Sequence, residues 1–212
     1  ELRDLEESDH DTTLPTLLAG GKSSAGNMFD IVALNHVTIT GFDMHLSAAA
    51  GSLVDCEVFY KPGTYVGSET DAGAWTLAAS AQANAAGLGV ATEVPFKLDI
   101  TVPAGETYAF YVTTTGAGVS YTDGTAVGDV CAQDANIRLL EGAGKNYPFG
   151  NTFQPRVFNG AVRYRCAATL AVVVGEEAGT WEYPFHTYFH DARTQVIYLA
   201  SELPGAGTIE SL

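Results

Sequence analysis

The chain has 212 residues, of which 10 are Lys or Arg and 25 are Asp or Glu, so its formal net charge is −15. This charge argues against nucleic-acid binding, which requires Lys and Arg to neutralise phosphates, and against electrostatic docking on an anionic membrane. No apolar run approaches the roughly 18 residues of a transmembrane helix, so we expect no membrane insertion. With 46% hydrophobic residues, the chain can bury a core.

The first twelve residues form an acidic segment, in which six of the first eleven residues are acids and one, Arg3, is a base. Such a composition is typical of a solvated leader or linker, and a short helix or a partner-binding arm is the alternative. We therefore predict a leader over 1–12 and a folded domain over 13–168.

Within 13–168, apolar and polar residues alternate with a period of two, which predicts β-strands. In chain order, strands are expected at 27–34, 36–46, 53–61, 74–80, 94–102, 107–114, 136–141 and 158–167. In the second of these, the apolar positions change from odd to even numbers at Thr40-Gly41, which predicts a β-bulge. The segments 94–102 and 107–114 surround a Pro-Ala-Gly turn, so we predict an antiparallel hairpin with one solvent-exposed face.

About nine or ten short strands separated by turns rich in Gly and Pro predict an all-β fold. An antiparallel β-sandwich with Greek-key or jelly-roll crossings fits this spacing. The absence of alternating strand and helix patterns excludes a doubly wound fold.

After residue 168 the character of the sequence changes. An apolar run at 170–174, an aromatic cluster at 181–189 and a strand candidate at 194–199 follow one another. About 40 residues are too few for a sandwich of their own. We predict that 169–212 is an extended β segment that packs on the main domain, pairs with a neighbouring subunit or stays loose.

Several motifs carry a resemblance when they are taken together. They are Gly26–Ile31, Phe59–Gly67, Tyr108–Thr113, Gly144–Gly150 and Pro155–Gly160. As a set they resemble a β-rich module of large, secreted, multidomain surface proteins of bacteria, over roughly residues 13–168. The stretch from Tyr183 to Ile209 resembles the opening strands of a second such module. The resemblance implies a secreted, cell-surface location and supplies no catalytic residues.

Asp123, Asp129 and Asp134 lie in a loop that contains glycine and joins two expected strands. Oxygen-rich loops of this kind bind calcium in many extracellular modules, although this spacing matches no EF-hand. Calcium is therefore the one cofactor that the sequence suggests, and the favoured interpretation is an ordinary solvated turn.

Tyr65, Trp75 and Tyr147 lie near expected turns. Exposed rings at such positions would stack on sugars, as in carbohydrate-binding modules. The favoured alternative is that Trp75 packs in the core and the tyrosines line its rim.

Three cysteines allow at most one intrachain disulfide. Cys56 and Cys166 have the inward phase of their expected strands, whereas Cys131 falls in an expected loop. We therefore predict a Cys56–Cys166 bond.

The sequence contains no nucleophile elbow or other catalytic motif, so we expect no enzyme. The predicted function is a structural or adhesive subunit of a cell-surface assembly or filament linked by β-strand pairing. A carbohydrate-binding module of a secreted hydrolase, with glycans as partners, is the alternative. The expected subunit contacts are Val172, Val174, Trp181, Phe185, Tyr188, Val196 and Tyr198.

Overall fold

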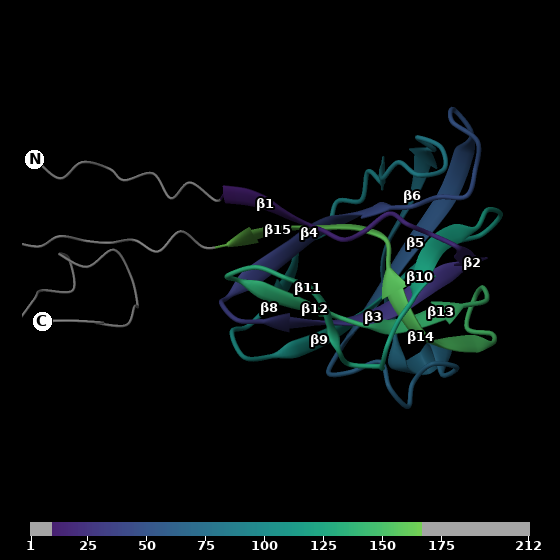
Figure 1. Cartoon of the computed structure of the whole chain (residues 1–212). Coiled ribbons are helices and arrows are strands. Elements are labelled where there is room, and N and C mark those ends of the chain that lie inside the picture. Colours follow the sequence, from purple (N-terminus) through teal and green to yellow (C-terminus); the bar gives the residue numbers. More distant parts are fainter. Residues whose placement is uncertain (1–9, 167–212) are drawn as a thin grey trace, which may run out of the picture. The chain divides into compact units, whose positions relative to one another are not determined.

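The computed structural model describes residues 10–166, which form fifteen β-strands and one short 3₁₀ helix, η1 (Ala72–Ala74) (Figure 1). The strands are β1 (His10–Pro15), β2 (Lys22–Ser24), β3 (Gly26–Ala33), β4 (Val37–Met44), β5 (Leu53–Pro62), β6 (Thr76–Asn84), β7 (Thr92–Glu93), β8 (Ile100–Val102), β9 (Thr107–Thr114), β10 (Val119–Asp123), β11 (Val130–Gln133), β12 (Ile137–Leu140), β13 (Gly142–Lys145), β14 (Thr152–Phe158) and β15 (Gly160–Cys166). In this part of the chain no helix is long and apolar enough to cross a membrane. The expected all-β class is confirmed.

The strands form two antiparallel sheets. The smaller sheet has five strands in the order β1-β15-β4-β7, with β8 also paired to β4. The larger sheet has ten strands in the order β2-β10-β14-β13-β3-β9-β5-β6, and β12 and β11 extend it from β3. The chain crosses between the sheets after β1, β3, β4, β6, β8 and β14. The two sheets bury a common core, which confirms the predicted antiparallel β-sandwich.

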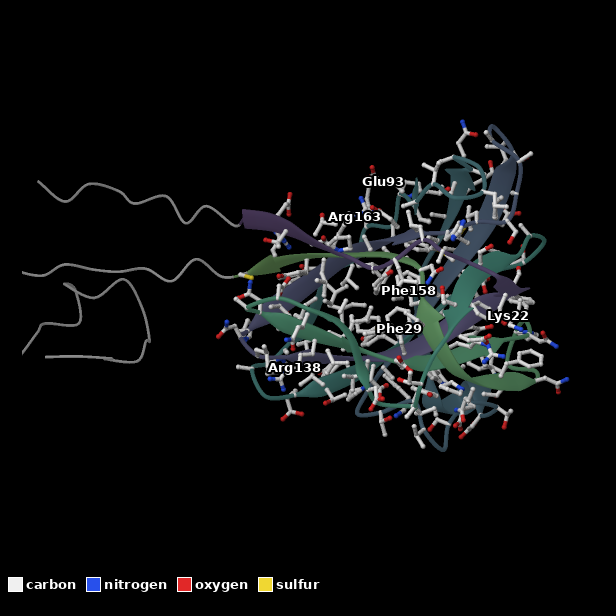
Figure 2. The ribbon with its side chains drawn as sticks, viewed as in Figure 1. Lys22, Phe29, Glu93, Arg138, Phe158 and Arg163 are labelled. Carbon is white, nitrogen blue, oxygen red and sulfur yellow. The ribbon has the colours of Figure 1, made fainter. Side chains whose placement is uncertain are left out.

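Alternate residues of both sheets point into this inner core. At its centre, Phe29 on β3 and Phe158 at the end of β14 lie with ring centroids 4.7 Å apart (Figure 2). Phe42 on β4 of the smaller sheet meets Phe29 edge-on at 5.8 Å. Burial of each such ring contributes roughly 1.5–3 kcal/mol, so this contact between the sheets is a main source of stability.

The bulge expected at Thr40 is confirmed. On β15, the consecutive residues Arg163 and Tyr164 pair with Gly41 and Ile39, which leaves Thr40 as the extra residue of β4. The extra residue moves the buried positions from odd numbers before it to even numbers after it. The sequence pattern and the pairing register therefore report the same irregularity.

The expected strand over 94–102 is only partly formed. Every second residue from Val94 to Val102 is buried, as expected. Regular pairing is restricted to β7 before this row and β8 at its end, because Pro95 has no N–H to donate. The backbone N–H groups of Val94 and Leu98 donate only long hydrogen bonds, 3.4 and 3.3 Å, to carbonyls of β4.

The predicted hairpin between 94–102 and 107–114 is wrong. β8 pairs with β4 in the smaller sheet, whereas β9 pairs with β3 and β5 in the larger one. The turn between them carries the chain across the sandwich. The outward face of β9 is not exposed to solvent either, because Ala109 and Tyr111 are fully buried.

The strands begin before the expected domain boundary at residue 13. β1 begins at His10 and pairs with β15, so residues 10–12 belong to the sandwich. The expected C-terminal β segment, 169–212, lies outside the described residues.

Candidate functional site

The three aspartates of the expected calcium site do not converge. Asp123 ends β10 and forms ion pairs with Arg156 at 3.1 Å and Lys22 at 3.7 Å. Asp129 accepts a hydrogen bond from the Thr125 hydroxyl at 3.0 Å. Each carboxylate therefore satisfies its charge or its hydrogen bonds locally.

The Asp134 carboxylate accepts hydrogen bonds from a turn instead of binding a ligand. Its Oδ1 accepts hydrogen bonds from the backbone N–H groups of Asn136 and Ile137, at 2.8 and 2.9 Å. Its Oδ2 accepts one from the Tyr164 hydroxyl at 2.6 Å. Across residues 10–166, no three His, Cys, Asp or Glu side chains are grouped to hold a metal ion. The predicted calcium site is therefore not assembled by the described residues.

Glu141 is the acidic residue that organises this loop, and no sequence pattern pointed to it. It is buried, and its Oε2 accepts hydrogen bonds from the backbone N–H groups of Thr125 at 2.6 Å and Ala126 at 3.0 Å. Its Oε1 accepts one from the Thr125 hydroxyl at 3.2 Å. Backbone and hydroxyl donors thus satisfy both oxygens of this buried carboxylate.

A second apolar cluster covers the outward face of the larger sheet, and we call it the outer cluster. Its buried members are Met28, Tyr65, Trp75, Ala109, Tyr111 and Ala143, with Phe59, Ala74 and Phe149 packed against them. Trp75 is 8% exposed, and its indole N–H donates to the Ser68 carbonyl at 2.9 Å. Tyr65 is 1% exposed, so neither ring can stack on a sugar.

Two buried charged residues fasten the loops that cover the outer cluster. The Asp30 carboxylate accepts hydrogen bonds from the Thr64 hydroxyl at 2.5 Å and the Tyr65 backbone N–H at 3.0 Å. The Lys145 ammonium donates to the Gly150 carbonyl at 2.6 Å and the Thr152 hydroxyl at 2.7 Å. Burial raises the pKa of Asp30 and lowers the pKa of Lys145.

Tyr147 is the exposed member of the predicted aromatic set, at 41%. Partial desolvation and the neighbouring Glu57 carboxylate raise the pKa of its hydroxyl. Glu57 also lines a shallow depression of about 440 Å³ on the sheet, together with Asp55, Ser80 and Gln82. The depression thus offers carboxylates, an amide and a hydroxyl close to one exposed ring.

The predicted Cys56–Cys166 disulfide is not present, since all three cysteines are free thiols. Cys56 lies on β5 of the larger sheet and Cys166 ends β15 of the smaller one. Cys131 lies on β11 and not in a loop. Burial raises the pKa of Cys56 and of Cys131 to about 12, with additional effects of Asp55 and Glu141, so both thiols stay protonated at neutral pH.

The predicted subunit contacts, from Val172 to Tyr198, lie outside the described residues. The described chain ends at Cys166, which pairs with His10 of β1, so both ends of the described chain leave the same end of the smaller sheet (Figure 1). Cys166 therefore lies beside the edge strand β1.

Comparisons with known proteins leave the family open. No family model and no curated protein sequence matches this chain. Among solved structures, it is similar to the crystal structure of the infectious bursal disease virus VP2 subviral particle, with 15% sequence identity and a TM-score of 0.20. The match covers 76% of this chain and 36% of that one, so the chain spans about a third of its length. A TM-score this low carries no argument, and the resemblance to bacterial surface modules stays a prediction.

Proposed function

We propose that this protein is a non-catalytic structural or adhesive subunit of an extracellular cell-surface assembly, joined from copy to copy by β-strand pairing. The observation that carries the proposal is that residues 10–166 fill a sandwich core by themselves. Phe29, Phe42, Phe110 and Phe158 at its centre are each at most 1% exposed. The centre of this core is therefore filled by the described strands alone.

The sequence after β15 contains residues suited to a contact between subunits. Its expected contact residues are large and apolar, and they stand on segments with strand-forming sequences. Large apolar groups left in water form costly patches, whereas burial of each contributes roughly 1.5–3 kcal/mol. The edge of a neighbour's sheet is the natural partner, since its unpaired N–H and C=O groups accept an added strand.

The test is deletion of residues 170–212, followed by thermal unfolding and by mass measurement in solution. We expect the truncated protein to unfold cooperatively and to be monomeric, while the full chain forms oligomers or filaments. A truncated protein that still assembles would overturn the proposal. So would one that no longer folds, because the C-terminal segment would then belong to its own domain's core.

A second candidate function, glycan binding, is favoured by the depression beside Tyr147. Carboxylate and amide groups hydrogen-bond sugar hydroxyls, and one exposed ring gives a stacking surface. The burial of Tyr65 and Trp75 removes the wider aromatic platform and leaves this smaller one.

Titration of the protein with neutral and acidic oligosaccharides tests this candidate. Tyr147→Ala should abolish binding, and Phe153→Ala, at another exposed aromatic residue, should leave it unchanged. Equal loss in both variants, or no binding by the unsubstituted protein, would exclude a site at this depression.

A further inference from the structure

Six of the described strands lie at sheet edges. They differ sharply in how they are protected against pairing with a strand of another molecule. β2, β7, β8 and β11 have two to four residues each, and β1 contains Asp11 and ends at Pro15. β6 has nine residues and contains neither a charged residue nor a proline. Natural sheets protect their edges with short strands, charges, prolines or bulges. β6 therefore has the least protected edge in the described sandwich.

Among the described residues, the outer side of β6 has no strand partner. Its backbone hydrogen bonds to other described strands all go to β5. One bulge, at Ala78, interrupts the register, and the six residues 79–84 pair regularly. A regular run of this length accepts a strand of five or six residues.

The inner core is incompletely covered along this edge. Ala79, Ala81 and Ala83 pair with inward-facing residues of β5, so their methyl groups point into the sandwich. Ala83 is buried, whereas Ala79 and Ala81 are only half-buried. An added strand with large apolar residues at alternate positions would cover the two half-buried methyl groups.

The segment Leu170–Val174, with the sequence Leu-Ala-Val-Val-Val, has this pattern. It is uncharged, and in an extended conformation Leu170, Val172 and Val174 would share one face. It also begins only four residues after the end of β15.

The length of chain between the end of β15 and Leu170 decides which copy can supply the added strand. Four residues span at most about 14 Å. β15 and β6 are on different sheets, and β4 and β7 separate β15 from the edge that contacts β6. Strand spacings of about 4.8 Å and a sheet separation of about 10 Å put the outer side of β6 about 17 Å or more from β15. A second copy is not limited in this way.

We infer that the outer edge of β6 is the acceptor for Leu170–Val174 of a second copy. The added strand extends the larger sheet, and its large side chains complete the inner core beside Ala79 and Ala81. This inference rests on the proposed function and identifies the surface that receives the joining strand. Repetition from copy to copy gives a closed ring or an open chain of subunits, depending on the rotation between neighbouring copies.

The acceptor variant is Ala81→Lys, which places an inward-pointing charge on the edge strand. Ala132→Lys is the matched control, because Ala132 is a half-buried alanine on the edge strand β11. The donor variant is V172D/V174D. Circular dichroism confirms the fold of each variant, and Ala79→Lys replaces Ala81→Lys if the latter does not fold.

We expect the acceptor and donor variants to be monomeric and the control to assemble. A mixture of the two monomeric variants should give a 1:1 heterodimer, since one retains a donor strand and the other an acceptor edge. Backbone amides within 76–84 of the donor variant should exchange at least ten-fold more slowly in that heterodimer.

Assembly of folded Ala81→Lys would overturn the inference and leave the proposed function intact if deletion of 170–212 still abolishes assembly. Two folded monomers that form no heterodimer would overturn it in favour of pairing within one chain. Slower exchange in β11 and not in β6 would place the joint at another edge.

Discussion

The larger sheet buries apolar residues on both of its faces, but the two faces are covered by different kinds of structure. The inner core lies between two hydrogen-bonded sheets, and its central aromatic rings come from strands on both sides. The outer cluster lies between one sheet and two connections, the loop that contains Tyr65 and Trp75 and the turn that contains Phe149. The same strands, β3 and β9, supply residues to both.

Burial alone therefore does not measure a region's contribution to the fold. A connection can lift away from a sheet while the sheet's ladders remain, whereas the inner core cannot open without separating the sheets. We therefore expect the inner core to set the global stability and the outer cluster to set the stability of a local unit.

Phe29→Ala tests the inner core and should have the largest effect. Phe29 contacts Phe42, Phe110 and Phe158, and a cavity among these rings cannot collapse easily. The free energy of unfolding should fall by about 3–5 kcal/mol. Urea denaturation measures it, and a loss below about 2 kcal/mol would show that the two sheets are not held mainly by this contact.

Trp75→Ala tests the outer cluster and should cost less, about 2 kcal/mol, because the loop can settle onto the remaining rings. Its main result should be local. Proteases should cleave within residues 63–75 while the amides of β3 and β9 keep their protection from hydrogen exchange. If those strand amides lost protection as well, the outer cluster would be part of the global core.

The sequence predicted which segments form the strands of the inner core better than it predicted how those strands pair. Alternation identified the inward rows of β4, β5 and β9, and it located the bulge at Thr40. It could not show that β8 and β9 belong to different sheets, because burial periodicity is the same for either partner. It also missed short strands such as β2 and β13, whose few residues show no clear alternation.

The candidate site was less predictable, because tertiary contacts decide which polar groups matter. The motifs around Phe59–Gly67 and Gly144–Gly150 both contribute to the outer cluster, which no local pattern shows. No sequence pattern pointed to Asp30, Lys145 or Glu141, which are buried and hydrogen-bonded to loops. The three aspartates of the predicted calcium site are close in sequence, but each has different bonding partners in the fold.

Titration of the buried His45 should make the stability of the folded state depend on pH. It is buried at the end of β4, and its Nε2 accepts a hydrogen bond from the Gly89 backbone N–H at 2.7 Å. Burial lowers its pKa, against a smaller opposite effect of Asn159, so unfolding takes up a proton when the pH is below the unfolded value of about 6.5. Stability should fall as the pH decreases below 6.5, by at most about 1.4 kcal/mol per pH unit.

The variants His45→Gln and His36→Gln separate this effect from that of other groups. Urea denaturation between pH 7.5 and 5 should show a weaker decrease in stability for His45→Gln than for the unsubstituted protein. His36 is exposed, and its variant should follow the unsubstituted protein. Equal slopes in all three proteins would exclude His45 as the source.

Asp30, beneath the outer cluster, should give the smallest effect and the opposite sign. Burial raises its pKa above the ordinary value of 3.8, against hydrogen bonds from Thr64 and Tyr65, so the folded state binds a proton more readily than the unfolded chain. Its contribution to stability is fully present below pH 3.8 and is lost as the pH rises through the folded pKa.

Asp30→Asn removes the buried charge and keeps an acceptor oxygen, so stability at pH 7 should change by less than about 1 kcal/mol. The relative gain of the unsubstituted protein on acidification should disappear in this variant, while Asp11→Asn, on an exposed residue, should retain it. Because we expect the outer cluster to open locally, proteolysis within 63–75 as a function of pH is the sensitive measurement. Faster cleavage of the unsubstituted protein at lower pH, with no difference in Asp30→Asn, would reverse the sign assigned here.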